Sequence, residues 1–172
     1  GAGSQALNQA RCLRKEEVET VIIGRDPGSA SMKAAAAEGF TVVNLENIPR
    51  LDVLAFGIPD DQQVLQIPAI LRSLPNRTTL MFFHGMSVHY GLQKFYGLEL
   101  QQALIGWNIG GAMPKGPGST VWKNKEAGGG IAVLVAALET SPDYEGTLAI
   151  SKAYGTGLGG YRGAMLKTTF AE

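Results

Sequence analysis

The first six residues have the types and spacing of a phosphate-binding turn. They read Gly-Ala-Gly-Ser-Gln-Ala, which fits the pattern Gly-x-Gly-x-x-Gly/Ala, and a helix-compatible run follows at once. In this pattern the glycines allow a tight turn and a close approach to a pyrophosphate, while the third small residue lets helix and strand pack closely. The helix N-terminus then offers unpaired N–H groups to the phosphates. The turn predicts a dinucleotide site with these cofactor-binding residues: Gly1, Ala2, Gly3, Ser4 and Gln5.

A second group of residues follows at the distance where such folds bind the adenosine ribose. Arg25 stands about twenty residues after the turn, where NAD-binding folds place an acidic residue and NADP-binding folds can place an arginine. Its guanidinium matches phosphate geometry, and Ser29 and Ser31 add hydroxyl donors. Asp26 could instead accept from the ribose of NAD. The alternative interpretation is an arginine in solvent beside a serine helix cap.

Two further residues could act on a substrate. His84 follows the apolar run Leu-Met-Phe-Phe and precedes Gly85, and Lys115 lies between two prolines in a glycine-rich turn. Histidine titrates near neutral pH and is the commonest general acid or base. A lone histidine at a strand end is also often structural, and the alternative for Lys115 is a surface lysine.

Composition limits the classes of partner. The chain of 172 residues has a net charge of zero and no basic block, so we do not expect a nucleic-acid partner. Its one cysteine, Cys12, excludes an internal disulfide and a cysteine-based metal site. No apolar run reaches about 18 residues, so no membrane partner is expected. We expect a cytoplasmic protein, although a plastid or mitochondrial targeting peptide, once removed, would leave no trace.

The elements that position these residues alternate between strand and helix. Strands are predicted at 19–23, 41–44, 51–58, 78–83, 103–112, 131–138 and 164–170. Helices are predicted at 5–17, 32–38, 61–74 (with a kink or break at Pro68) and 147–156. Residues 86–102 are ambiguous, and 113–130 read as a long loop. This alternation predicts one α/β domain over 1–172, a Rossmann-like doubly wound, mostly parallel sheet with helices on both faces.

The candidate residues share one place in the predicted sheet. The residues after 23, 58, 83 and 112 all follow predicted strands, and ligands of such sheets bind beyond the carboxyl ends of the strands. The turn at 1–6 should follow a strand as well. Because the sequence starts at the turn, we expect the leading strand of the sheet to be missing.

In order and approximate spacing, the motifs resemble those of ketol-acid reductoisomerase, also called acetohydroxy acid isomeroreductase. The resemblance runs from Gly1 to Phe170. The segments that carry it are residues 1–6, Arg25, Gly28-Ser29-Ala30-Ser31, Pro59-Asp60, His84-Gly85, Pro114-Lys115-Gly116-Pro117-Gly118, Gly128-Gly129-Gly130 and Thr168-Thr169-Phe170. The ordered set is far more specific than any single motif.

The resemblance implies an activity for the intact protein. The family moves an alkyl group in 2-acetolactate or 2-aceto-2-hydroxybutyrate with Mg²⁺, and then reduces the product with NADPH to a 2,3-dihydroxy acid. This is a step toward valine, leucine and isoleucine. A helical C-terminal domain carries most of the magnesium ligands, and the oligomer of the full-length protein depends on it. That domain is absent from this sequence, so we assign no metal ligand here and expect little or no turnover from these residues alone.

By motif match, the resemblance implies roles for individual residues. Ala2 to Gln5 would contact the pyrophosphate, and Arg25, Ser29 and Ser31 the 2′-phosphate. Four residues would line the cofactor elsewhere, namely Asp60, Asp61, Gln62 and Gly118. His84 matches the active-site histidine, and Lys115 the lysine beside the metal site. The sequence departs from the family at Ala6, at Met86-Ser87-Val88 and at Met113, and the last two departures affect the shape of the substrate pocket.

Two other functions fit part of the pattern. The chain could be a stand-alone NADP(H)-binding or redox-sensing module without catalysis. It could also derive from a dehydrogenase of the β-hydroxyacid type, which uses a lysine from a helical second domain. The loop at 114–118 argues against the dehydrogenase.

Overall fold

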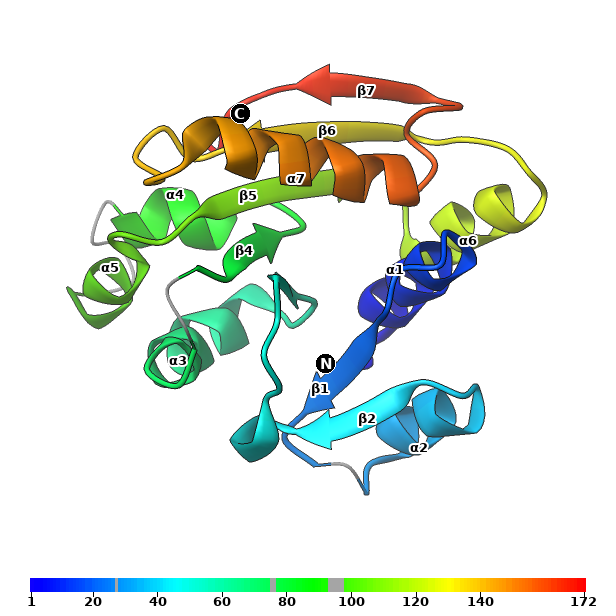
Figure 1. Cartoon of the computed structure of the whole chain (residues 1–172), viewed down its shortest axis with the longest axis horizontal. Helices are drawn as coiled ribbons and strands as arrows, with labels where there is room; N and C mark the ends of the chain where they lie inside the picture. Colours follow the sequence, from blue (N-terminus) through cyan, green and yellow to red (C-terminus); the bar gives the residue numbers. More distant parts are fainter. Residues whose placement is uncertain (27, 75–76, 93–97) are drawn as a thin grey trace.

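The computed structural model describes residues 1–26, 28–74, 77–92 and 98–172. The strands form two sheets (Figure 1). In the smaller sheet, β1 (Val21–Gly24) pairs in parallel with β2 (Thr41–Asn44). The larger sheet has the order β3-β4-β5-β6-β7, with the bounds Val53–Phe56, Thr79–Phe82, Ile109–Pro114, Ala132–Ala137 and Ala164–Lys167. Its pairs are parallel except for β5 with β6, which is antiparallel.

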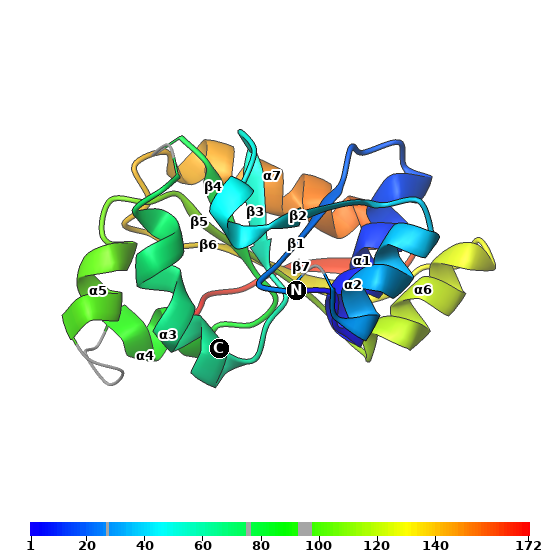
Figure 2. The same ribbon diagram turned by 90° about the horizontal axis from the view of Figure 1, so that it is seen from below.

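Helices cover both faces of the larger sheet. They are α1 (Ser4–Lys15), α2 (Ala30–Ala37), α3 (Asp60–Leu71), α4 (Met86–Leu92), α5 (Leu98–Leu104), α6 (Gly118–Glu126) and α7 (Tyr144–Gly157), with a 3-10 turn η1 at Leu45–Asn47. Seen from below, α7 lies on one side of the strands and α3 and α4 on the other (Figure 2). The α/β class, the mostly parallel sheet and the helices on both faces are therefore confirmed.

The core follows from the alternation of side chains along the strands. Leu54 and Phe56 on β3 point to the face that α3, α4 and α5 cover, where Ile67 and Leu100 are fully buried. Val53 and Ala55 point to the opposite face and join the cluster of α1, α6 and α7. A third cluster fills the space between the smaller sheet and α2, around Phe40.

Three predictions about elements were wrong. The strand expected at 103–112 begins only at Ile109, because α5 continues to Leu104. The loop expected at 113–130 contains α6, which buries only Gly118, Val121 and Lys125 and so lacks a helical stripe of apolar residues. Of the kink or break expected at Pro68, the break does not occur, because buried Ile67, Ile70 and Leu71 hold the last turn of α3 against the core.

The ambiguous stretch 86–102 contains α4 and α5, and its residues 93–97 lie outside the described part of the chain. Among the helices that the structure describes, none is long and apolar enough to cross a membrane.

Candidate functional site

The turn at residues 1–6 leads directly into α1 at the carboxyl ends of two strands. The Gly1 amino nitrogen donates to the Ile23 carbonyl oxygen at the end of β1, at 2.7 Å. On its other side, a Cβ on Gly1 would lie 3.0 Å from the Ile58 side chain and 3.3 Å from the Gly57 carbonyl oxygen, just past the end of β3. The turn is thus enclosed between the ends of β1 and β3. Burial lowers the pKa of the Gly1 amino group.

Ala6 and Gly3, two small residues of the turn, are small for different structural reasons. A Cβ on Gly57 would lie 2.4 Å from the Ala6 Cβ, so the third motif position sits where helix and strand approach closely, as the motif predicts. Gly3 is different, because a Cβ there would meet nothing within 4 Å. Gly3 is the N-cap of α1 and supplies no side-chain hydrogen bond, so its open surface and the first-turn N–H groups suit an anion.

Gly118 lies at the start of α6, beside the start of α1. A Cβ there would lie 2.8 Å from the Ser4 carbonyl oxygen and 2.9 Å from the Gln5 Cα. The glycine therefore permits the two helix starts to touch. Its position is therefore beside the turn at residues 1–6.

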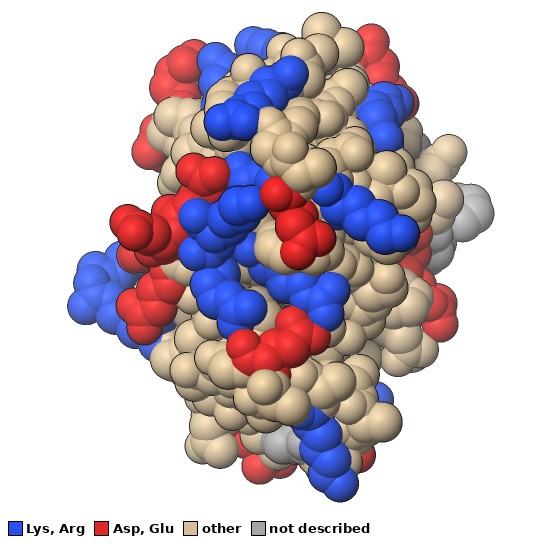
Figure 3. Space-filling model, turned by 90° about the vertical axis from the view of Figure 1, so that its right-hand side faces the viewer, with Lys and Arg blue, Asp and Glu red and all other residues tan. Residues whose placement is uncertain are grey.

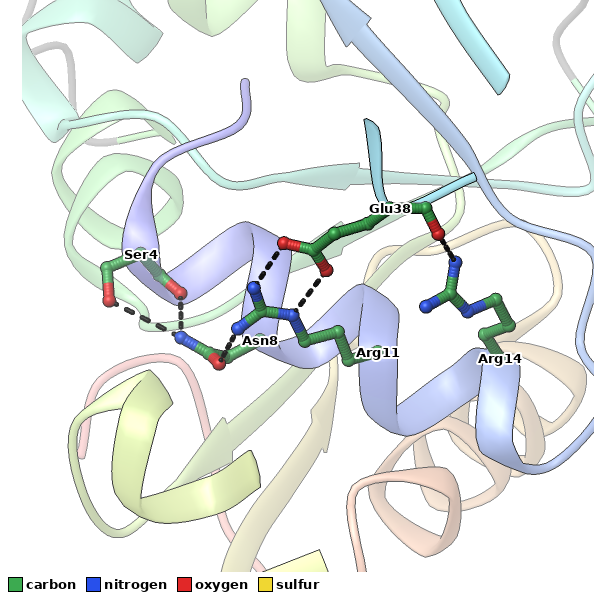
Figure 4. Close-up of polar contacts among 5 residues, drawn as sticks. All are labelled: Ser4, Asn8, Arg11, Arg14 and Glu38. Carbon is green, nitrogen blue, oxygen red and sulfur yellow. Dashed lines mark hydrogen bonds and ion pairs between the residues drawn. The ribbon is translucent and has the colours of Figure 1, made fainter. Parts of the chain in front are cut away.

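A polar network connects α1 with the end of α2 (Figure 4). Asn8 donates from Nδ2 to the Ser4 carbonyl oxygen at 2.7 Å, and Arg11 donates from Nη1 to Asn8 Oδ1 at 2.7 Å. Arg11 also binds both carboxylate oxygens of Glu38, at 2.5 and 2.7 Å. This hydrogen-bonded pair holds the pKa of Glu38 below its usual value. The network fixes α2, and with it the loop before α2, relative to the turn.

The loop after β1 presents the predicted ribose-binding residues. Arg25 is exposed directly after the strand. Asp26 Oδ1 accepts from the Gly28 N–H at 2.8 Å, so one carboxylate oxygen of Asp26 holds the loop. Ser29 occupies the N-cap position of α2, and its side chain makes no capping hydrogen bond. Its hydroxyl oxygen lies 3.5 Å from that of Ser31, an exposed residue in the first turn of α2.

A second site surrounds His84, after β4. His84 Nδ1 lies 3.5 Å from Asp60 Oδ1, and the same oxygen accepts from the Ser87 hydroxyl at 2.9 Å. The His84 side chain is 42% exposed and borders a cavity of about 240 Å³. The cavity is also lined by residues of the last segment, 168–172. That segment packs tightly, since a Cβ on Gly85 would lie 2.4 Å from the Phe170 carbonyl oxygen.

The structure groups some predicted residues and separates others. Asp60 begins α3 and points toward His84, a pairing that sequence reasoning missed together with Ser87. Asp61 accepts from Gln62 Nε2 at 3.0 Å, and Gln62 in turn accepts from Gln66, so this pair lies along the start of α3. Lys115 is exposed after β5 and does not line the His84 cavity.

NADPH and magnesium, which the family resemblance implies, can be compared with these side chains. A phosphorylated dinucleotide fits the open first turn of α1 and the exposed Arg25. It also fits the Ser29 hydroxyl, which makes no capping hydrogen bond. Magnesium does not fit in the same way, because the described residues contain no group of three or more His, Cys, Asp or Glu side chains that could hold a metal. Cys12 offers no nucleophile, since burial raises the pKa of its thiol to about 11.

Charged side chains of both signs are interspersed on the face that includes α1 and α6 (Figure 3). Two ion pairs tie these helices to their neighbours. One is the Arg11–Glu38 pair, and the other joins buried Lys125 on α6 to Glu16 at 2.5 Å. The hydrogen bond from Lys125 lowers the pKa of Glu16. These charges therefore serve first to hold the helices together.

Solved structures share the fold across nearly the whole chain. A ketol-acid reductoisomerase from an uncultured archean, described as NADH-preferring, superposes with a TM-score of 0.79 at 23% identity, covering 99% of this chain and 50% of that one. A putative NADP oxidoreductase from Bacteroides fragilis gives 0.70 at 16% identity, covering 99% and 59%. Prephenate dehydrogenase from A. aeolicus, bound to hydroxyphenyl propionate and NAD⁺, also gives 0.70 at 16%, covering 99% and 58%.

These likenesses establish the fold, and the chain spans between half and three fifths of the length of these structures. A family model gives the closer assignment. Residues 1–164 match the model described as acetohydroxy acid isomeroreductase, NADPH-binding domain. The chain therefore belongs to the acetohydroxy acid isomeroreductase family, and its matching part is the NADPH-binding domain of that family.

Proposed function

We propose that this chain binds NADPH as the cofactor domain of a ketol-acid reductoisomerase. The observation that carries the proposal is the position of Gly1, held between the ends of β1 and β3. In this position the turn that would hold the pyrophosphate lies near the start of the Arg25 loop. On its other side the turn lies against Gly57 and Ile58, shortly before Asp60 in the chain. The family match supports the choice of cofactor.

Each group of residues would bind one part of the cofactor. The N–H groups at the start of α1, at Gly3 to Gln5, would hold the pyrophosphate. Arg25, Ser29 and Ser31 would bind the 2′-phosphate, through charge-assisted hydrogen bonds that favour NADPH over NADH. Bound NADPH supplies a hydride. The remaining cofactor-lining residues of this proposal are Gly1, Ala2, Asp60, Asp61, Gln62 and Gly118.

His84 is the proposed acid or base of the substrate side. Asp60 Oδ1 lies 3.5 Å from His84 Nδ1 and accepts from Ser87, so the carboxylate is held beside the ring while Nε2 would be available to a ligand. Lys115 is proposed as a second substrate-side residue, on the family match of its loop. Because Lys115 lies outside the His84 cavity, a shared role would require a substrate that spans both.

The substrate would be a 2-hydroxy-2-keto acid, 2-acetolactate or 2-aceto-2-hydroxybutyrate, and the product a 2,3-dihydroxy acid of branched-chain amino acid synthesis. The alkyl migration of this reaction is magnesium-dependent in the family, and the described residues alone do not group the carboxylates for it. We therefore propose that the 172 residues bind NADPH without turnover. We further propose a cytoplasmic homo-oligomer for the whole enzyme.

The cofactor assignment can be tested by reversing charge in the ribose loop. Arg25→Asp with Ser29→Asp should weaken NADPH binding by on the order of 100-fold, because two charge-assisted contacts are lost. Arg72→Asp is a matched control, since Arg72 is an exposed arginine after the far end of α3, where it pairs with Glu99. Calorimetric titration measures both variants. An unchanged dissociation constant for NADPH in the double variant would remove Arg25 and Ser29 from the site.

A further inference from the structure

The outer edge of β7 is open to a further strand. Among the described residues, β7 pairs only with β6 and ends the order of the larger sheet, and it lies at the margin of that sheet (Figure 1). All four of its residues are exposed, whereas β2, at the margin of the smaller sheet, exposes only Thr41. Exposed strand edges with unpaired N–H and C=O groups are templates for another strand.

The ladder with β6 fixes which backbone groups of β7 point outward. Thr168 donates its N–H to the Val135 carbonyl oxygen, and Val135 is in register with Lys167. In a parallel ladder this pattern turns the N–H and C=O groups of Leu166 and Thr168 toward β6. Because these groups alternate along a strand, those of Met165 and Lys167 point to the open edge.

Two copies of β7 satisfy both open edges if they pair antiparallel about Leu166. In that register, Met165 of each copy forms a hydrogen-bonded pair with Lys167 of the other, which uses every outward N–H and C=O group of the strand. Leu166 then faces its own counterpart as a non-hydrogen-bonded pair, with Cα atoms about 4.5 Å apart. The pairing has two-fold symmetry and is closed, as in most homodimers.

The apolar side chains of β7 suit this register. A Cβ on Gly155 of α7 would lie 3.2 Å from Met165 Sδ, so Met165 faces α7 and Leu166 points to the opposite face of the sheet. Leu166 is 55% exposed and in register with Leu134 on β6. Pairing would therefore continue a row of leucines from Leu134 through both copies of Leu166 and cover apolar surface that is now open to water.

Charge does not oppose the pairing. A lysine on an edge strand commonly discourages association. Lys167 is the charged residue of β7, and its Nζ lies 5.5 Å from the centre of the Tyr144 ring, so the ammonium group is held over α7. In the antiparallel register Lys167 stands opposite Met165 of the second copy, so no like charges face each other across the ladder.

We propose that the outer edge of β7 is a self-association surface, to which a second copy of this chain adds its own β7 in antiparallel orientation. The dimer joins two five-stranded sheets into one of ten strands. The interface requires neither bound cofactor nor turnover. Its failure would therefore leave the proposed cofactor site untouched.

Analytical ultracentrifugation of the unmodified chain tests the association between about 10 µM and about 1 mM, because a single ladder is a small interface. We expect monomer and dimer with no larger species, since the pairing is closed. Leu166→Glu should raise the dimer dissociation constant at least about 10-fold, because it places two carboxylates face to face. Leu65→Glu is the matched control on α3, where Leu65 is 72% exposed, and should leave the constant unchanged.

A second pair of variants isolates the backbone. Lys167→Pro removes an outward N–H and leaves the ladder with β6 intact, whereas Lys167→Ala removes only the side chain. The proline variant should lose the dimer and the alanine variant should keep it. Far-ultraviolet circular dichroism checks that each variant is folded.

Hydrogen exchange locates the interface in the unmodified chain. Where the dimer predominates, the amides of Met165 and Lys167 should exchange at least about 5-fold more slowly than in the monomer. The Leu166 amide already faces β6 and should not change. If a variant fails to fold, this pattern decides alone, and no selective protection of the Met165 and Lys167 amides refutes the interface.

The sedimentation results can also overturn the proposal. A chain that stays monomeric over the whole concentration range has no such interface. A dimer that persists in both Leu166→Glu and Lys167→Pro, or an assembly that grows beyond the dimer, would assign the association to another surface of the molecule.

Discussion

At the residue scale, Gly3 in the turn and Gly57 beside it differ in what a side chain at each position would meet. Gly57 faces Ala6 at a distance that excludes a Cβ, whereas Gly3 faces open space and has an ordinary φ of −65°. Gly57 therefore serves packing. Gly3 leaves the surface of the turn open, where the proposed pyrophosphate would lie.

This difference gives a paired prediction. Gly57→Ala should lower the free energy of unfolding by roughly 1–3 kcal/mol, because its Cβ would overlap Ala6. Gly3→Ala should leave stability within about 0.5 kcal/mol, yet weaken NADPH binding because its methyl group stands where the pyrophosphate would approach. Urea unfolding and NADPH titration of both variants provide the check. A Gly3→Ala protein with undiminished affinity would argue against the proposed pyrophosphate turn.

Also at the residue scale, Asp60 shows what sequence reasoning could and could not find. Its place after a strand and at the start of a helix could be predicted, and so could the position of His84. The contacts of one Asp60 carboxylate oxygen with His84 and Ser87 could not, because they depend on how α3 and α4 pack side by side. From the sequence, Ser87 could be singled out only as a departure from the family pattern. Its hydrogen bond to Asp60 could not be predicted.

At the scale of elements, charged pairs hold α1 to its neighbours and so place the cofactor turn. The Arg11–Glu38 pair connects α1 with α2, and both side chains are partly shielded. Because Arg11 lowers the pKa of Glu38 in the folded state, the pair contributes stability above the unfolded value of 4.5. That contribution is lost as the pH falls through the lowered folded pKa.

We therefore expect Glu38→Gln to destabilise the chain by about 0.5 kcal/mol at neutral pH. At acid pH the deficit should shrink as the pH falls through the lowered folded pKa of Glu38, because Glu38 then becomes protonated in the parent as well. Exposed Glu46→Gln is the control. Urea unfolding at both pH values measures the effect, and a deficit of the same size at both would show that Glu38 acts through packing instead of charge.

The elements that the sequence predicts well are those with a clear apolar pattern or a strong stop. β2 was expected at the bounds it has, and Gly39, with a φ of +83°, follows α2 where a helix end was expected. α6 was missed because Val121 is its only large apolar buried residue and glycines and prolines surround it. The start of β5 was predicted too early because α5 continues to Leu104.

At the scale of the whole molecule, the candidate cofactor site lies across the gap between the two sheets. The ribose loop belongs to β1 and the smaller sheet, whereas Asp60 and His84 belong to the larger one. Gly1 touches the ends of both edge strands, so it connects the two halves of the site.

The central claim, that these residues form an NADPH site, is tested most directly by titrating NADPH and NADH separately into the unmodified chain in a calorimeter. Because Arg25, Ser29 and Ser31 would contact only the 2′-phosphate, we expect a dissociation constant for NADPH that is about 10-fold or more below that for NADH. Equal affinity for the two cofactors, or no binding of NADPH, would contradict the account.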